Sequence, residues 1–324
     1  MFNNNDLWGT PMEFGVYLRS AQTYQKMLEL SRAAEELDYY GVFVNDHVEG
    51  LSGDRKEPYW EAWTLMTGIG VETKKIRVGQ ITLFNSMRNP ALLAKMTATL
   101  DQMTGGRYEL ILGAGWSEPE YEGYDLMEKG RGMPSAGERV SRLKESVDIL
   151  KGMLHNEVFN YEGKYWKLKE AMNVPQPVQK PFRISVGARQ PRMIKITAKY
   201  ADGINSSGNL QNISRILGIY HKNLETLGKT VDDVFISGFA PSVYLMKNEA
   251  EYEETLQKWK ARGTDINVSR EHGFIGTSEV LIEKWRRAMD MGMKMSIINV
   301  RPSTTIPENA EMLARFKDEV ASQL

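Results

Sequence analysis

Residues 76–116 read IRVGQITLFNSMRNPALLAKMTATLDQMTGGRYELILGAGW, and the fold is inferred first from this segment. Two short runs rich in aliphatic residues, Ile76–Thr82 and Arg107–Gly113, have the composition of strands. Between them, apolar residues recur at intervals of three and four: Leu93, Met96, Leu100 and Met103. That spacing is typical of a helix with one buried face, and Asn89 followed by Pro90 is a favourable helix start. The stretch therefore predicts a strand, a helix and a second strand.

The same alternation of strand and helix continues along the whole chain. Eight runs have strand character: Met12–Leu18, Gly41–Asn45, Ile76–Thr82, Arg107–Gly113, Phe182–Gly187, Asp202–Ser207, Val234–Met246 and Met295–Val300. Strands that alternate with helices form parallel sheets. Eight such units favour an α/β fold of the closed (β/α)8 TIM-barrel type, with an open doubly wound sheet as the alternative. No linker divides the sequence, so we expect residues 1–324 to form a single domain.

Two segments exceed what a minimal barrel needs, and both fall between the fourth and fifth predicted strands. Residues 115–134 are rich in Gly, Glu and Tyr, and residues 155–180 carry several aromatic residues and prolines. Loops that follow barrel strands lie on the face where catalysis occurs. Two interpretations stay open: one of these insertions covers the site as a lid, or both are surface excursions without a role in the chemistry.

The composition excludes several classes of function. The 324 residues carry a net charge of −1, so the chain lacks the basic surface of a nucleic-acid-binding protein. The absence of cysteine rules out disulfides, thiolate metal sites and a cysteine nucleophile. No apolar stretch is long enough to span a bilayer, and residues 1–9 lack the apolar core of a signal peptide, so we expect a cytoplasmic protein without a membrane partner. Histidines and carboxylates show no metal-ligand spacing, so no metal site is expected.

Candidate functional residues follow the predicted strands, where barrel enzymes place their catalytic groups. His47, one of four histidines, comes just after the second strand and is preceded by Asp46. A histidine there can move protons near neutral pH, although a loop histidine that only bonds backbone is the alternative. After the fourth strand, Gly113 and Gly115 allow a ligand to approach the backbone, and Trp116 offers a flat apolar face. Structural turns explain such a Gly-Ala-Gly segment equally well.

The loop after the fifth strand predicts an anion site. Gly187, Ala188, Arg189 and Gln190 lead into a helical segment that begins near Pro191. The N–H groups at a helix start have no partner within the helix and attract anions. We expect a cofactor phosphate to rest on the N–H groups of the first four of these residues, with the two small ones leaving room for its oxygens. The loop has neither a P-loop lysine motif nor a Rossmann fingerprint.

Taken together, these loops resemble the luciferase-like monooxygenase superfamily, and most closely its branch that uses coenzyme F-420. The resemblance rests on residues 88–101 (RNPALLAKMTATLD), 104–107 (TGGR) and 112–116 (LGAGW). It extends to Tyr200–Gly203 and the Gly276–Thr277 turn, and so covers essentially the whole chain. The loop after the fifth strand is also similar to that of methylenetetrahydromethanopterin reductases, which belong to this branch.

The resemblance implies a homodimeric barrel that binds the isoalloxazine-like ring of F-420, or of FMN as the alternative, at its C-terminal mouth. It also implies a cis peptide bond between non-proline residues at the end of the third strand, here Ile81–Thr82. Thr82, Leu83 and Asn85 would then line the rear face of the ring. The catalytic residues expected are His47 and Asp46. The cofactor-binding residues expected are Ile81, Thr82, Leu83, Asn85, Gly113, Gly115, Trp116, Gly187, Ala188, Arg189 and Gln190.

The sequence departs from two members of this branch, the F-420-dependent alcohol and glucose-6-phosphate dehydrogenases. Those enzymes have a tryptophan four residues after the histidine and a glutamate after the Gly-x-Gly, whereas this sequence has Leu51 and Trp116 at these positions. The acid–base set for oxidising an alcohol is therefore expected to be incomplete. Hydride transfer from reduced F-420 to a small unsaturated acceptor is favoured instead, because this reaction requires less proton transfer by groups of the protein.

Other functions stay open from the sequence. Within the same class, the chain could be an FMN-dependent monooxygenase that is supplied by a separate flavin reductase. A flavin-binding protein without catalysis is a second alternative, since the predicted site holds one histidine and few acids. A barrel aldolase or isomerase acting on phosphosugars is a third, but it normally needs a lysine or carboxylate at a strand end, and none stands out here.

Overall fold

The computed structural model describes residues 12–51, 55–301 and 310–324. Its centre is a ring of eight parallel strands: β1 (Glu13–Tyr17), β2 (Gly41–Val44), β3 (Arg77–Gln80), β5 (Tyr108–Gly113), β8 (Ile184–Gly187), β9 (Gly203–Ser207), β10 (Phe235–Leu245) and β12 (Met295–Arg301). Each strand pairs with the next, and β12 pairs with β1 in the register Glu13↔Met295, which closes the ring. The predicted TIM barrel and all eight predicted strands are confirmed. The open-sheet alternative is wrong, because the first and last strands are hydrogen-bonded to each other.

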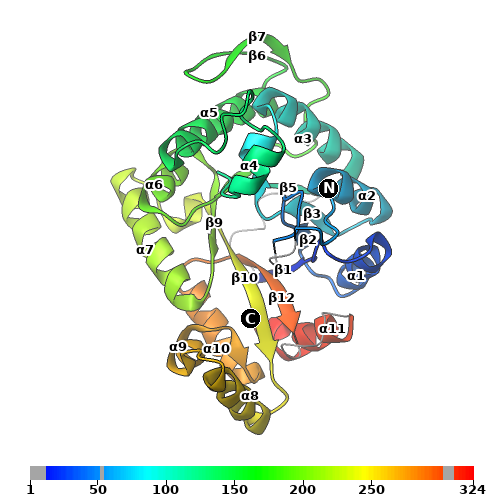
Figure 1. Cartoon of the computed structure of the whole chain (residues 1–324), viewed down its shortest axis with the longest axis vertical. Coiled ribbons are helices and arrows are strands. Elements are labelled where there is room, and N and C mark those ends of the chain that lie inside the picture. The colour runs from blue at the N-terminus through cyan, green and yellow to red at the C-terminus, as the bar shows by residue number, and fades with distance from the viewer. Residues whose placement is uncertain (1–11, 52–54, 302–309) are drawn as a thin grey trace.

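Helices surround the barrel on all sides (Figure 1). One main helix follows each barrel strand: α1 (Tyr24–Glu36), α2 (Ala62–Glu72), α3 (Pro90–Thr104), α5 (Ala136–His155), α6 (Pro191–Tyr200), α7 (Leu210–Thr226), α10 (Ser278–Met289) and α11 (Ala310–Glu319). The predicted start of α3 is confirmed, since Asn89 Oδ1 accepts the N–H groups of Ala91 and Leu92. The helix ends at Gly105, whose φ of 65° lies in the left-handed region that favours glycine. None of the described helices is both long and apolar enough to cross a membrane.

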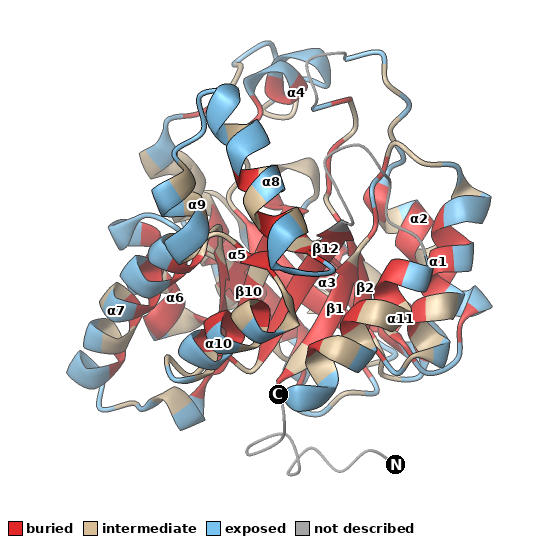
Figure 2. Ribbon diagram, turned by 90° about the horizontal axis from the view of Figure 1, so that it is seen from below, coloured by how far each residue is buried: buried red, intermediate tan, exposed pale blue. Residues whose placement is uncertain are grey.

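The elements outside this repeating pattern are the helices α4 (Glu118–Gly123), α8 (Glu249–Ala261) and α9 (Ile266–His272), the strands β4 (Leu83–Phe84) and β11 (Ile275–Gly276), the hairpin of β6 (Val158–Glu162) and β7 (Lys167–Met172), and the 3₁₀ turns η1 (Asn85–Met87), η2 (Val231–Asp233) and η3 (Ala321–Gln323). The two predicted insertions differ in place. The first contains α4, which follows β5 and packs at the end of the barrel (Figure 2). The second contains the β6–β7 hairpin, which lies outside α5 (Figure 1), where Glu145 accepts the N–H groups of Lys164 and Tyr165. Residues of α8 and α9 form a further excursion after β10 that the sequence did not indicate.

The barrel strands separate two apolar cores. Phe43, Ile111 and Ile297 belong to a cluster inside the barrel, whereas their chain neighbours Val42 and Ile298 belong to the larger cluster that the strands share with the helices. This alternation follows from the two-residue period of a strand. Figure 2 shows the result: the barrel strands are mostly buried, and the surrounding helices bury one face and expose the other.

A buried ionic cluster closes the N-terminal ends of the strands. Glu109, in β5, accepts hydrogen bonds from Arg77 Nε at 2.5 Å, from Arg183 Nη2 at 2.8 Å and from the Tyr40 hydroxyl at 2.7 Å. The guanidinium of Arg183 also lies 3.6 Å from the centre of the Phe235 ring. All five residues stand at or next to the first residues of barrel strands, so their contacts join neighbouring strands at this end.

The cluster shifts the pKa values of its members in opposite directions. Burial alone would raise the pKa of Glu109, but the charges of Arg183 and Arg77 outweigh burial and lower it to about 2. Burial and the charge of Glu109 raise the pKa of Tyr40 to about 12, against the opposing effect of Arg183. The carboxylate is therefore ionised and the phenol neutral across the physiological range.

We expect Glu109→Gln to lower the free energy of unfolding by about 3–5 kcal/mol, because it leaves two largely enclosed guanidinium groups, those of Arg77 and Arg183, without their counter-charge. The lowered pKa sets the pH dependence. The stabilisation by Glu109 is complete above its ordinary pKa of 4.5 and is lost as the pH falls toward 2. Urea unfolding curves of the two proteins should therefore differ by a constant amount at neutral pH and converge as the medium becomes acidic.

The matched control is Glu72→Gln, which breaks an ion pair between two half-exposed side chains, Arg32 and Glu72. Such pairs contribute little, so this variant should unfold almost as the wild type does at every pH. If Glu109→Gln changed the free energy of unfolding as little as the control does, the cluster would not stabilise the barrel.

Candidate active site

A cavity of about 490 Å³ lies at the C-terminal ends of the barrel strands. Its walls come from the ends of seven strands and from the first turns of α5 and α6: Tyr17, Asn45, Asp46, His47, Ile81, Thr82, Phe84, Gly113, Ala114, Gly115, Trp116, Ala136, Arg139, Val140, Gly187, Ala188, Arg189, Gln190, Met193, Asn205, Ser207 and Phe239. Barrel enzymes bind their substrates at this end. The cavity is therefore the candidate active site.

Most of the predicted site residues line this cavity, namely Asp46, His47, Ile81, Thr82, Gly113, Gly115, Trp116, Gly187, Ala188, Arg189 and Gln190. Leu83 and Asn85 do not line the cavity, and their expected contact with the ring of the cofactor stays a prediction. Side chains alternate along an extended segment, so Thr82 and Phe84 face the cavity while Leu83 packs into the core shared with the helices. Asn85 begins the turn η1 and is buried there.

Two glycines allow Thr82 to approach the neighbouring strands. The peptide bond between Ile81 and Thr82 is cis, as the resemblance implied. A Cβ at Gly113 would lie 2.1 Å from Thr82 Oγ1, and one at Gly187 would lie 2.6 Å from Thr82 Cγ2. A larger residue at either place would displace the threonine. Gly187 is thus needed for packing against Thr82, and its expected role of leaving room for phosphate oxygens stays a prediction.

The turn after β5 brings Trp116 to the rim of the cavity. Gly115 has a φ of +77°, and a Cβ there would lie 1.9 Å from the ring of Phe84, so glycine is required on both counts. The side chain of Trp116 is in edge contact with His47, with ring centroids 5.4 Å apart and an interplanar angle of 67°. Trp116 is 63% exposed, so an apolar face is available beside the cavity.

His47 is paired with a carboxylate that the sequence analysis missed. Its Nδ1 lies 2.7 Å from Glu120 Oε2, and Glu120 Oε1 accepts the N–H of Val48, also at 2.7 Å. Burial alone would raise the pKa of Glu120, but the hydrogen bonds from His47 and Val48 outweigh burial and lower it. An ionised Glu120 makes Nδ1 of His47 the protonated, donating nitrogen. The other ring nitrogen, Nε2, is then the one that can exchange a proton with a substrate.

The carboxylate of Asp46 is fully occupied by contacts within the protein. Its Oδ2 accepts the N–H of Phe84 at 2.8 Å and Nη1 of Arg88 at 2.5 Å, and its Oδ1 accepts Nη2 of Arg88 at 3.1 Å. These bonds join the loop after β2 to the loop after β3. The arrangement fits a residue that positions the neighbouring His47 better than one that transfers protons itself.

Another part of the wall carries positive charge and free donors. Arg139, on α5, lines the cavity, and its Nε is buried without a hydrogen-bond partner among the described residues. Helix α6 begins at Pro191, and the side chain of Gln190 does not cap it, so N–H groups of its first turn remain free. The N–H of Ala188 donates to the carbonyl of Asn205 at 3.1 Å and is not available to a phosphate, contrary to the prediction.

Glu120 and Arg139 could not be singled out from the sequence. Residues 115–134 contain four glutamates, and only the packing of α4 decides that Glu120 turns inward. One feature of the sequence could have indicated Arg139 as a site residue. It lies in the first turns of the helix that follows a barrel strand, and side chains there can reach the mouth of the barrel.

The sequence matches the luciferase-like monooxygenase family over residues 7–303. It is 30% identical over 315 residues to an F420-dependent glucose-6-phosphate dehydrogenase of Microbacterium testaceum (strain StLB037), covering 95% of this chain and 89% of that protein. It is 23% identical over 307 residues to the pyrimidine monooxygenase RutA of Bradyrhizobium sp. (strain BTAi1 / ATCC BAA-1182), covering 93% and 82%.

Solved structures show the same fold. An F420-dependent secondary alcohol dehydrogenase in complex with an F420-acetone adduct superposes with a TM-score of 0.80 at 18% identity. The superposition covers 97% of this chain and 100% of that chain. The coenzyme F420 dependent tetrahydromethanopterin reductase from Methanopyrus kandleri gives a TM-score of 0.74 at 17% identity, over 97% and 99%. With a closed barrel, a cavity at its mouth and a family match along nearly its whole length, this chain belongs to the luciferase-like monooxygenase family.

Proposed function

We propose that this protein is an F420-dependent oxidoreductase that transfers hydride between F420 and a small organic acceptor. The observation that carries the proposal is that one cavity combines the His47–Glu120 pair with a positively charged end that contains Arg139. The first feature suits proton transfer to or from an acceptor, and the second suits a cofactor phosphate. Relatives named as F420-dependent dehydrogenases support the choice of cofactor.

The residues of the cavity fit such a cofactor. The buried, unpartnered Nε of Arg139 is a donor that a phosphate oxygen would satisfy. Arg139, Arg189 and the first turn of α6 would hold the phosphate, and Thr82, Gly113 and Trp116 would surround the ring. When bound, the cofactor supplies the hydride chemistry, and the protein supplies binding and orientation.

The chain itself handles the proton. In the oxidation of an alcohol, Nε2 of His47 would take the hydroxyl proton while hydride leaves the carbon that bears it. In the reverse direction, the same nitrogen would return the proton to the carbonyl oxygen. Glu120 stabilises the charged imidazole that appears between these steps.

The expectation of an incomplete acid–base set, drawn from Leu51 and Trp116, needs correction. Glu120 provides a carboxylate from α4, and Trp116 lies against His47 although it stands at a different sequence position. Carbonyl compounds and alcohols are therefore candidate substrates beside unsaturated acceptors.

An FMN-dependent monooxygenase is the second candidate function, because pyrimidine monooxygenases are among the relatives. It would use the same cavity and would require a separate flavin reductase. The His47–Glu120 pair speaks against a protein that only binds a flavin, since such a protein needs no acid–base group in its cavity. Parallel titrations with F420 and FMN, followed by absorbance and fluorescence, separate the candidates. Tight binding of FMN without binding of F420 would replace the proposed cofactor.

Replacement of Arg139 tests the phosphate end of the cavity. Arg139→Ala should raise the dissociation constant for F420 about tenfold or more, because it removes a charge-assisted contact to the phosphate. Arg131→Ala is the control, since Arg131 is exposed and pairs with Glu138. Isothermal titration calorimetry measures both. Equal affinities for the two variants would place the phosphate elsewhere.

Replacement of His47 tests the chemistry. We expect His47→Ala to lower kcat about 10²-fold or more while the affinity for F420 changes little, because the imidazole acts on the acceptor. Glu120→Gln should lower kcat less, since it only weakens the orientation of the ring. His155→Ala, at the far end of α5, should be silent. Oxidation of reduced F420 with a panel of ketones, aldehydes and enones provides the assay, and unimpaired turnover in His47→Ala would leave the histidine a structural role only.

We also propose that two copies of the chain associate through α2 and α3. Val71, Leu92 and Met103 are exposed apolar residues on these two helices, and Met96 lines a shallow groove between them. Exposed apolar surface of this kind marks an interface. Light scattering coupled to gel filtration should give a dimer for the wild type and a monomer for Leu92→Glu. A wild-type monomer at micromolar concentration would contradict the proposal.

A further inference from the structure

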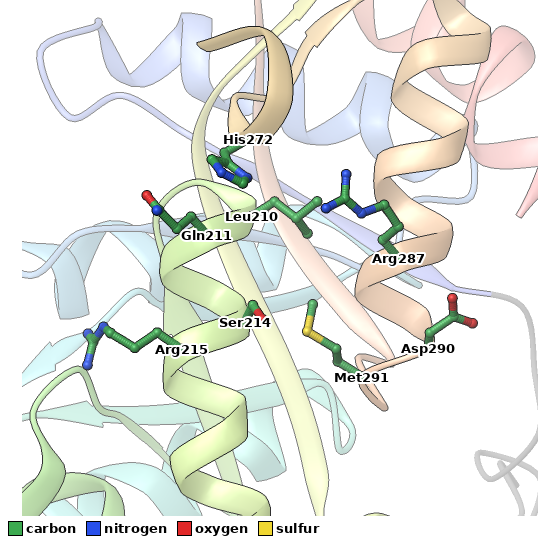
Figure 3. Close-up of a pocket in the computed structure, with 8 residues that line it drawn as sticks. All are labelled: Leu210, Gln211, Ser214, Arg215, His272, Arg287, Asp290 and Met291. Carbon is green, nitrogen blue, oxygen red and sulfur yellow. The ribbon is translucent and has the colours of Figure 1, made fainter. Parts of the chain in front are cut away.

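A second cavity lies outside the barrel, between α7 and α10 and below the end of α9 (Figure 3). We refer to it as the α7–α10 groove. Its volume is about 490 Å³, comparable to that of the active-site cavity, and none of its lining residues lines that cavity. The size is sufficient for a small metabolite. Nothing in the proposed function uses this groove.

Arg287 is the central charge of the groove. Figure 3 shows its side chain extending from α10 toward Leu210 on α7, below His272, whereas the carboxylate of Asp290 points away. Within the described ranges, Arg287 makes no hydrogen bond or ion pair. Its surroundings hold further positive charge: burial, Arg287 and Arg270 lower the pKa of Lys284 to about 8.

His272 provides a second, independent observation. Its Nδ1 is buried and has no hydrogen-bond partner among the described residues, while its Nε2 lies 3.6 Å from the exposed carboxylate of Glu271. A buried polar nitrogen without a partner is unfavourable, and a polar group in the groove would relieve it. Helix α7 begins at Leu210, so the positive end of its dipole lies at the same place.

We propose that the α7–α10 groove binds a small organic anion whose phosphate or carboxylate pairs with Arg287. The guanidinium fork suits either group, because both offer two oxygens in one plane. Leu210 and Met291 provide apolar contacts for the carbon part of the ligand, and Ser214 can bond a hydroxyl group. The proposal is independent of the F420 chemistry.

The groove borders the active site through one contact. At its rim, Arg215 Nη2 donates to the carbonyl of Arg189 at 3.0 Å, and Arg189 lines the active-site cavity. A phosphate compound can therefore meet positive charge at two neighbouring places. The experiment has to tell the two places apart. The Arg139→Ala background helps because it weakens phosphate binding in the active-site cavity and leaves the residues of the groove unchanged.

Calorimetric titration with glycerol 3-phosphate, with glycerol as the uncharged control, tests the proposal. In the full-length Arg139→Ala background, the phosphate should bind and glycerol should not. Arg287→Ala should then weaken binding about tenfold or more, whereas Arg286→Ala should leave it unchanged. Arg286 is the matched control, because it is the neighbouring exposed arginine of the same helix and does not line the groove.

The variant His272→Gln and the salt concentration provide two further tests of binding in the groove. His272→Gln should also weaken binding, and added salt should reduce the affinity because the contact is ionic. Thermal unfolding checks that each variant is folded. Little change in the unfolding temperature is expected for Arg287→Ala and Arg286→Ala, because both arginines are exposed. Equal affinities for Arg287→Ala and Arg286→Ala would overturn the proposal. So would the loss of all phosphate binding in the Arg139→Ala background, since the probe would then occupy the active site alone, a result that leaves the F420 proposal intact.

Discussion

The carboxylate of Glu109 is the charge that links neighbouring strands at the N-terminal end of the barrel. This carboxylate lies between two guanidinium groups and a phenol at the narrow N-terminal end, and the partners come from the starts of neighbouring strands. Their contacts join those strands at one end. The opposite end is then free to carry loops of different length and chemistry, which is the usual division of labour in this fold.

At the mouth of the barrel, the packing of side chains against glycines shapes the wall of the cavity. Thr82 sits against two strands because Gly113 and Gly187 have no Cβ, and Phe84 packs over Gly115 for the same reason. These contacts shape a wall of the cavity before any ligand binds. Each of the three glycines is therefore required for packing at the wall of the cavity.

The acid–base group of the site depends on an insertion. His47 follows β2, but the carboxylate that orients it comes from α4, in the segment after β5. The loop after β2 brings His47 to the mouth, and α4, in the insertion after β5, brings Glu120 to the same place. The His47–Glu120 pair is therefore assembled from two segments that lie far apart in the sequence. Asp46 contributes through Arg88 by tying the loop of His47 to the next one.

The sequence was sufficient to predict the barrel, its eight strands and the place of His47. Strand periodicity and loop composition are local properties, encoded by residues that are close together in the chain. Through the resemblance it also located the cis bond at Ile81–Thr82. Tertiary structure alone decided that Glu120 faces His47, that Leu83 turns away from the cavity and that the N–H of Ala188 is already bonded. Each of these depends on which groups from other loops come within hydrogen-bond or van der Waals distance, and such distances are set by packing between segments far apart in the chain.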